Sequence, residues 1–511
     1  MNVLLRRGEV TARPAGALAL GILEGGTALT GAAAAVDRAT RGAIRSLLKR
    51  GDFSGRFLES VVLYPRGLGA QRVILVGLGR ARDLDPGRVR RAAGLAARRA
   101  RELGAGTLVT VAHGAGPAYL KTGLDPARAA QATAEGSILG HYRFTSYKRD
   151  AGTPPLKRIE VLEKDAALAR ALTPAVERGA RWAEAVCLAR DLINTPGQDL
   201  VPERLAARAR EIGRDRGARV EVLGVAQLER LGMGALLAVG RGSVHPPRLI
   251  VLDRPPRGTS GTRGRRAANV PTVVLIGKGV TFDTGGISLK PRENMHRMKY
   301  DMSGAAAVLG VFSALPDLDL PFRVVGIVPS AENMPGGRAL KPGDVVRSMD
   351  GTTIEVTNTD AEGRLLLADA LGYARRFAPV AVVDLATLTG AITLALGHLA
   401  AGLFTGDERL AAELGAAAEA SGERIWRMPL WDDYAPEMRS DTADILNSAA
   451  REGGACLAAI FLKRFAGGMP WAHLDIASTA WAPVDRPHEP RGGTGYGVRL
   501  LLEWLSRRAE A

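Results

Sequence analysis

The chain has 511 residues, a length at which proteins usually divide into two or more domains. Hydrophobic residues make up 46% of it and charged residues 24%, which excludes a largely disordered chain. The formal net charge of +16 permits an acidic partner, and the two cysteines, Cys187 and Cys456, exclude a multi-disulfide framework and indicate a reducing cytoplasm.

The first region of the chain alternates between strand and helix patterns. Its start carries no signal-peptide core, because Arg6 and Arg7 interrupt the apolar run after three residues. Alternation of this kind predicts a sheet covered by helices. The predicted strands are residues 72–76, 107–112 and 159–162, and the predicted helices are residues 86–103 and 125–139.

A long helix is predicted over residues 165–194, where apolar residues recur at helical spacing. Pro196 and Pro202 follow it, and a larger α/β region begins there. We therefore predict an α/β fold with two domains. Residues 1–164 form the smaller N-terminal domain, and residues 165–511 form the linking helix and a larger C-terminal domain with a central mixed sheet flanked by helices.

Chemically active residues of the second region follow two predicted strands. Residues 273–276 lead to Lys278, and residues 354–357 lead to Asp360 and Glu362. Open α/β sheets bind ligands in the crevice at the carboxyl ends of their strands. The sequence thus predicts that these three side chains share one crevice.

Four acids lie at the ends of predicted elements: Asp283, Asp301, Asp360 and Glu362. A single D-x-E at a helix start is usually explained by the helix dipole. Four acids in one crevice would repel one another unless cations neutralised them. Oxygen ligands without a nearby cysteine favour Mg, Mn or Zn, and we interpret the neighbouring His296 as a non-ligand.

Three basic residues accompany the acids. Lys278 could bind a metal ion as a neutral amine, although a lysine near acids is more often a salt bridge. Lys290 should stay protonated and polarise a substrate carbonyl. Arg364 would hold an anion, either a substrate carboxylate or a small oxyanion that acts as a base. Together the acids and bases predict a two-metal hydrolase.

Residues 385–404 carry no formal charge over about the length that spans a bilayer. Glycines, threonines and His398 interrupt this stretch, and Asp384 precedes it. A buried strand, a turn and a helix therefore explain it better than a membrane span.

The two segments that hold the active groups are G-K-G-V-T-F-D-T-G-G-I-S-L-K (277–290) and N-T-D-A-E-G-R-L (358–365). They resemble the leucyl aminopeptidase family, the cytosol aminopeptidases that include bacterial aminopeptidase A. The similarity extends to A-R-D-L-I-N-T-P (189–196), M-K-Y-D-M-S-G-A-A-A-V (298–308), A-E-N-M-P-G-G-R-A-L-K-P-G-D (331–344), D-L-A-T-L-T-G-A (384–391), W-A-H-L-D-I-A (471–477) and G-T-G-Y-G-V-R-L-L (493–501).

The resemblance implies a role for each active residue. Asp283 and Glu362 would bridge two divalent ions, which the family holds as Mn or Zn, with Mg and Co as further candidates. Lys278 and Asp301 would complete the tightly held ion, and Asp360 the exchangeable one. The general base would be a bicarbonate ion held by Arg364, and Lys290 would stabilise the gem-diolate.

The resemblance also implies the substrate and the assembly. The enzyme would remove the N-terminal residue, preferably a leucine-like one, from peptides with a free N-terminus. It would work as a cytoplasmic homohexamer with no membrane partner. The substrate-binding residues would be Met298, Asn358, Thr387, Leu388, Gly390 and Ala477.

A DNA-binding regulator is the alternative function, either alone or in addition to peptidase activity. The net charge permits it, and residues 254–266 form a predicted basic loop rich in glycine and proline. The chain has only 5% aromatic residues and no helix-turn-helix pattern, so the alternative has little support from motifs.

Overall fold

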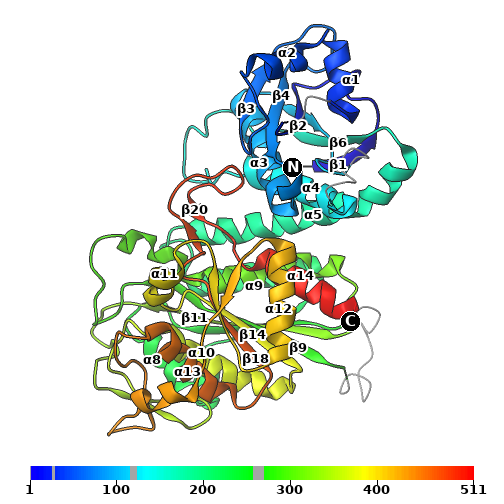
Figure 1. Ribbon diagram of the computed structural model, residues 1–511. Helices are drawn as coiled ribbons and strands as arrows, with labels where there is room; N and C mark the ends of the chain where they lie inside the picture. The colour runs from blue at the N-terminus through cyan, green and yellow to red at the C-terminus, as the bar shows by residue number, and fades with distance from the viewer. Residues whose placement is uncertain (1, 26–28, 116–122, 257–269, 511) are drawn as a thin grey trace. The chain divides into compact units, whose positions relative to one another are not determined.

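The computed structural model describes residues 2–25, 29–115, 123–256 and 270–510 (Figure 1). Most of the predicted basic loop at residues 254–266 lies outside them. The chain forms two compact units, and the division falls inside the long helix α5 (Ala166–Asn194). The smaller unit comprises Met1–Cys187 and Val484–Arg491, and the larger unit comprises Leu188–Pro483 and Gly492–Ala511. The predicted domain boundary after residue 164 stays a prediction.

The smaller unit is built on a six-stranded sheet in the order β1-β6-β5-β2-β4-β3. Neighbouring strands are parallel except for β3 and β4. The strands and helices predicted for this region are confirmed. Its strands are β1 (Asn2–Arg7), β2 (Ala17–Leu23), β3 (Ser60–Leu63), β4 (Val73–Gly79), β5 (Thr107–Thr110) and β6 (Arg158–Glu163), and its helices are α1 (Gly31–Ala39), α2 (Ala43–Arg50), α3 (Pro86–Glu102) and α4 (Pro126–His141).

The larger unit is built on a nine-stranded mixed sheet in the order β16-β15-β18-β14-β9-β11-β8-β7, with β10 paired to β11. Its central strands are parallel, and their buried apolar runs are typical of strands covered on both faces. The strands are β7 (Arg219–Leu223), β8 (Arg248–Arg254), β9 (Thr272–Gly277), β10 (Gly279–Asp283), β11 (Arg323–Asn333), β14 (Ala381–Ala386), β15 (Ala401–Phe404), β16 (Ile425–Arg427) and β18 (Trp471–Asp475).

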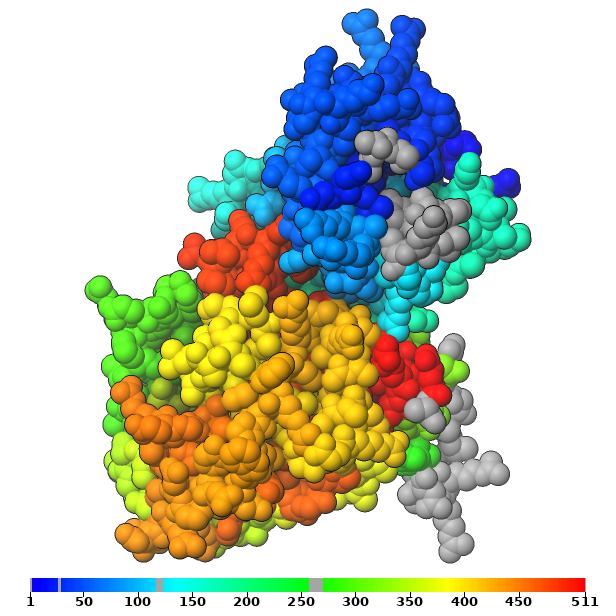
Figure 2. Space-filling model, viewed as in Figure 1, coloured from blue at the N-terminus to red at the C-terminus, as the bar shows by residue number. Residues whose placement is uncertain are grey.

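Helices cover this sheet in two layers. Figure 1 shows α10 and α13 on one side of the sheet and α9 and α14 on the other. In Figure 2, the yellow and orange segments, which include α12, cover the larger unit on the face in view. The helices of this unit are α6 (Pro202–Arg216), α7 (Val225–Arg230), α8 (Gly234–Gly240), α9 (Ser303–Ala314), α10 (Gly363–Ala374), α11 (Gly390–Leu396), α12 (Glu408–Ser421), α13 (Gly454–Ala466) and α14 (Val498–Glu510).

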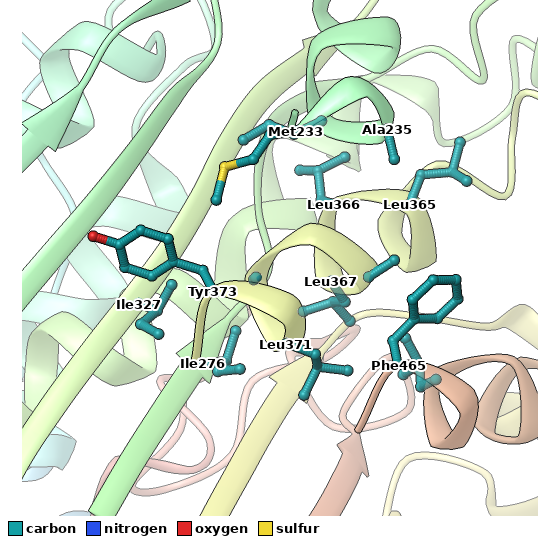
Figure 3. Close-up of a cluster of buried hydrophobic side chains, with 14 of the residues drawn as sticks. Met233, Ala235, Ile276, Ile327, Leu365, Leu366, Leu367, Leu371, Tyr373 and Phe465 are labelled. Atoms are coloured by element: carbon teal, nitrogen blue, oxygen red, sulfur yellow. The ribbon is translucent and has the colours of Figure 1, made fainter. Parts of the chain in front are cut away.

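Helix α10 is the centre of the largest described core cluster (Figure 3). Its leucines pack toward Ile276 of β9 and Ile327 of β11, and Phe465 of α13 closes the cluster. Burying a side chain of this size stabilises the fold by about 1.5–3 kcal/mol. The core therefore fixes α10 against the strands whose ends carry the active groups.

Five parallel strand ends meet at one edge of the large sheet. Strand β9 ends just before Lys278, β14 just before Thr387, and β10, β11 and β18 end at Asp283, Asn333 and Asp475. This is the edge at which open α/β sheets bind ligands. The prediction that Lys278 lies at the carboxyl end of a buried strand is confirmed.

Close backbone packing sets the position of α9 beside this edge. A Cβ atom on Gly304 would lie 2.1 Å from the carbonyl oxygen of Leu385, and one on Gly277 would lie 2.4 Å from that of Gly304. Only glycine allows such an approach. The Lys278 carbonyl then accepts the amide of Ala305 at 2.9 Å, so the start of α9 is joined to the end of β9.

The strand predicted at residues 354–357 is not part of the large sheet. Residues Thr353–Glu355 form β13, which pairs with β12 (Val345–Arg347) and β17 (Ile445–Leu446) in a separate three-stranded sheet. The physical reason lies in the alternation of buried Ile354 and Val356 with polar neighbours, which suits a strand covered on one face.

Residues 385–404 form the end of β14, then α11, then β15, which confirms the predicted strand, turn and helix. Among the helices of the described ranges, none is long and apolar enough to cross a membrane.

Candidate metal centre

Lys278 lies between two carboxylates. Its Nζ atom is 2.8 Å from Asp301 and 2.8 Å from Glu362, and it donates a hydrogen bond to the Thr387 carbonyl at 2.9 Å. All four residues are buried. Gly363, which follows Glu362, provides the space, since a Cβ there would lie 2.7 Å from Cε of Lys278.

Lys290 lies between a second pair of carboxylates. Its Nζ atom is 2.8 Å from Asp283 and 2.5 Å from Asp360. The glycine pair after Asp283 turns the chain back toward this lysine, and the amide of Gly285 donates to Asp283 at 2.9 Å. The structure thus brings the four predicted acids and both lysines together.

Burial and crowding shift the pKa values of these groups. Burial raises the pKa of Asp301 well above its ordinary value, and the charge of Asp283 adds to the effect. Burial also raises the pKa of Asp360 to about 6. Burial alone would lower the pKa values of Lys278 and Lys290, but the surrounding carboxylates raise both above the ordinary value. Among the protein's own groups, both lysines are therefore protonated.

The carboxylates fit one or more metal ions. One oxygen from each of Asp283, Asp301 and Glu362 lies within 4.8 Å of the other two. Oε2 of Glu362 is buried and accepts no hydrogen bond from the described residues, and Oδ2 of Asp301 is buried with the Lys278 ammonium 2.8 Å away. Carboxylate oxygens in a site that already attracts two ammonium groups form a donor set suited to hard divalent cations.

Arg364 lies on the first turn of α10, beside this cluster. It is buried, which lowers the pKa of its guanidinium to about 10. Its Nη1 atom donates to the carbonyl of Asn447 at 2.7 Å. Its Nε atom is buried and has no hydrogen-bond partner in the described ranges. The guanidinium therefore retains donors for an oxyanion.

The substrate-binding residues predicted after β14 and β18 are held by hydrogen bonds to Asp301 and Asp475. Oγ1 of Thr387 donates to Asp301 at 2.7 Å. One carboxylate oxygen of Asp475 accepts the amides of Leu388 at 3.1 Å and Ala477 at 3.2 Å. The two segments that carry these predicted substrate contacts are thus held by the single buried side chain of Asp475.

The other predicted substrate residues lie around the same segments. Oδ1 of Asn358 accepts the amide of Asp360 at 2.9 Å, so it shapes the acidic loop. Met298 is half-buried and lies three residues before Asp301, and Gly390 is the exposed first residue of α11. The side chain of His296, the predicted non-ligand, is exposed.

Three buried residues of the centre were not predicted from the sequence: Asn333, Asn447 and Asp475. Nδ2 of Asn333 donates to Asp283 at 2.8 Å and to the Thr359 carbonyl at 3.0 Å. Asn333 and Asp475 lie inside motifs that support the family resemblance, which is the signal that could have identified them. Asn447 lies outside those motifs.

Comparison with protein families identifies both parts of the chain. Residues 187–502 match the catalytic domain of the cytosol aminopeptidase family, and residues 19–151 match the N-terminal domain of the same family.

Individual relatives agree with these matches. A probable cytosol aminopeptidase of Geobacter sulfurreducens is 44% identical over 510 residues, which cover 99% of each chain. A probable cytosol aminopeptidase of Roseiflexus castenholzii is 47% identical over 463 residues, which cover 90% of this chain and 92% of the relative.

Solved structures show the same similarity in three dimensions. The bottromycin maturation enzyme BotP in complex with Mn is 41% identical, with a TM-score of 0.84 and coverage of 96% of this chain and 99% of that one. A mutant of tomato leucine aminopeptidase is 33% identical, with a TM-score of 0.86 and coverage of 99% and 96%.

Proposed function

Since the chain belongs to the cytosol aminopeptidase family and is an aminopeptidase, we propose that it removes leucine-like N-terminal residues from peptides with two divalent ions and a bicarbonate base. The observation that carries this proposal is the pairing of each lysine with two carboxylates, beside a buried arginine with free donors. A two-metal site needs several carboxylates in one place, which this cluster supplies.

The five predicted metal ligands divide between two ions in this proposal. Asp283 and Glu362 would be shared, Lys278 and Asp301 would complete the tightly held ion, and Asp360 the exchangeable one. Lys278 would bind as the neutral amine, because an arriving metal ion displaces protons from its ligands. When bound, two divalent ions, Mn or Zn, would lower the pKa of a water molecule and polarise the scissile carbonyl.

Lys290 and Arg364 perform the remaining chemistry. Lys290 keeps its proton, since the carboxylates around it raise its pKa, and it can donate to the oxygen on which negative charge develops. Arg364 would hold bicarbonate through the donors that the Asn447 carbonyl does not use. When bound, bicarbonate would supply a base that takes a proton from water and returns it to the leaving amine.

Substrate specificity depends on two features in this proposal. Asp301 would accept the free α-amine, which would restrict cleavage to the N-terminus. Met298, Leu388, Gly390 and Ala477 mix apolar and small surfaces, which suits a leucine-like side chain.

We further propose peptides with a free N-terminus as partners, a homohexamer as the assembly and the cytoplasm as the compartment. DNA binding is supported only by the formal charge of +16, and the basic loop that motivated it lies mostly outside the described residues.

Hydrolysis of leucine-p-nitroanilide by purified protein in bicarbonate buffer, with added Mn²⁺ or Zn²⁺, tests the proposed function. Glu362→Gln should abolish turnover, because it removes a shared ligand. Glu419→Gln, on an exposed face of α12, is the matched control and should leave turnover unchanged. Inactivity of the metal-loaded wild type, or full activity of Glu362→Gln, would contradict the proposal.

A further inference from the structure

Asn447 is fully buried at 0% exposure, directly after β17. Its main-chain amide donates to the carbonyl of Glu355, the last residue of β13, at 2.9 Å. Strands β13 and β17 run parallel, so Asn447 lies beside the point where the chain leaves β13 for the acidic loop. The small sheet therefore fixes the backbone of Asn447 independently of its side-chain contacts.

The side-chain amide of Asn447 is fully used by that loop. Its Oδ1 accepts the amides of Thr357 at 2.9 Å and Asn358 at 3.3 Å. Its Nδ2 donates to the carbonyls of Asn358 at 2.7 Å and Ala361 at 3.3 Å. These contacts lie on both sides of Asp360. A side chain with an acceptor and two donors on one short stem is needed to make all four.

The main-chain carbonyl of the same residue orients Arg364. It accepts Nη1 at 2.7 Å, while Nε is buried and receives no partner from the described residues. Nη2 donates no hydrogen bond to the described residues either. Because the Asn447 carbonyl occupies Nη1, the guanidinium edge formed by Nε and Nη2 stays available for an anion. That edge can donate two parallel hydrogen bonds to an oxyanion.

We propose that Asn447 is a positioning residue that holds the acidic loop and the anion-binding edge of Arg364 in one fixed arrangement. Its side chain sets where Asp360 and Glu362 stand, and its carbonyl sets which edge of Arg364 faces the anion. The part that concerns the anion rests on the proposed function, whereas the part that concerns the acids does not.

The test compares Asn447→Ala with Asp444→Ala. Asp444 is exposed, and its carboxylate accepts the amide and hydroxyl of Thr353, so its removal loosens the same strand pair without touching the acidic loop. Two quantities are measured on each full-length variant: the Mn²⁺ affinity by titration calorimetry, and the bicarbonate concentration that gives half-maximal hydrolysis. Thermal unfolding establishes that each variant is folded.

Asn447→Ala should weaken Mn²⁺ binding about 10-fold or more, as expected when a group that orients metal ligands is lost. It should also raise the half-activating bicarbonate concentration several-fold, whereas Asp444→Ala should change both quantities less than about 2-fold. A merely structural role would lower the unfolding temperature and leave both ligand responses unchanged.

Wild-type Mn²⁺ affinity and bicarbonate response in folded Asn447→Ala would overturn the proposal. If that variant does not fold, Asn447→Ser, which retains one polar atom, is judged by the same two quantities. An inactive wild type would contradict the proposed function, and the calorimetric comparison would still decide whether Asn447 positions the acids.

Discussion

Individual side chains in the metal centre are constrained by several partners at once. Thr387 connects two of them, because its hydroxyl donates to Asp301 and its carbonyl accepts Nζ of Lys278. A buried polar group whose partner is removed costs about 1–3 kcal/mol. A substitution here should therefore also shift the neighbouring metal-binding side chains. The effects of two such substitutions on stability and metal affinity should not be additive.

Arg364→Ala should lower turnover about 10- to 100-fold, less than the loss expected for Glu362→Gln. In the proposed mechanism, other bases in solution can partly replace the bicarbonate, whereas nothing replaces a shared metal ligand. The measurement is the rate of leucine-p-nitroanilide hydrolysis against bicarbonate concentration, which should lose its dependence in the variant. Arg375→Ala, which removes a hydrogen bond to the Phe465 carbonyl, serves as the control. A bicarbonate response equal to that of the wild type would contradict this role of Arg364.

His113 in the smaller unit should make stability depend on pH. Burial lowers its pKa from 6.5 to about 4, so the folded state resists protonation while the unfolded state accepts a proton below pH 6.5. The destabilisation by His113 is absent above pH 6.5. As the pH falls from 6.5 to 4, it lowers the free energy of unfolding by about 3 kcal/mol.

Thermal unfolding from pH 7.5 to pH 4 checks this prediction. The unfolding temperature of the wild type should fall more steeply below pH 6.5 than that of His113→Gln. Replacement of the exposed His245 by glutamine should reproduce the wild-type slope. Parallel slopes for the wild type and His113→Gln would show that His113 does not contribute.

At the level of elements, the metal centre depends on how closely α9 approaches β9 and β14. Asp301 comes two residues before α9, so any outward shift of this helix moves a predicted ligand away from Lys278. Gly277 and Gly304 therefore help to position the metal ligands, because they allow the close approach of α9, although neither is a ligand.

Gly304→Ala should destabilise the larger unit by about 3 kcal/mol or more, because the new methyl group would meet the Leu385 carbonyl. Gly415→Ala is the matched control. That glycine lies in α12 with open space around it, so alanine should be neutral or stabilise the helix by about 0.5–1 kcal/mol.

Thermal unfolding and Mn²⁺ titration calorimetry should separate the two glycine variants, with lower stability and weaker Mn²⁺ binding in Gly304→Ala alone. Equal behaviour of both would show that α9 can shift without consequence.

The sequence predicted elements well where local pattern decides them. Residues 86–102 form a helix as expected, because Asp85 caps it and Pro86 suits its first turn. The acids and lysines were also predictable, since charged residues at the ends of buried strands require compensation. The placement of residues 353–355 was not, because strand pairing in a separate sheet depends on β17, which lies about 90 residues further along the chain.

Asn447 was not predictable for a similar reason. An asparagine in a loop usually bonds to its own neighbours, and nothing local indicates contacts with residues 357–361. Asn333 and Asp475 could be identified only as parts of longer motifs. Their hydrogen bonds to Asp283 and to the 387–389 turn arise from strands that the fold brings together.

At the level of the whole molecule, the metal centre joins distant parts of the larger unit. Lys278 follows β9, and the groups that contact its ammonium come from Asp301 before α9, Glu362 before α10 and Thr387 after β14. Metal binding should therefore stabilise this unit as a whole, since the ligands come from elements that separate on unfolding.

Mn²⁺ at about 100 times its dissociation constant should stabilise the folded state by about 2.7 kcal/mol, and a chelator should remove this gain. Calorimetric unfolding with Mn²⁺ or with EDTA measures it. Glu362→Gln should show a smaller gain, and Glu419→Gln the full gain. The chelated wild type should remain folded at 25 °C, and loss of its cooperative transition would contradict the compensating role of the lysines.

The pairing of each lysine with two carboxylates has a consequence for the order of folding and metal uptake. Because Lys278 and Lys290 carry positive charge into the acidic cluster as the chain collapses, folding need not wait for an inorganic ion to arrive. Folding and metal binding are then separate stages. Folding needs only the chain itself, and the supply of ions in the cell affects only metal binding. An ion acquired in error could be exchanged without the protein having to unfold.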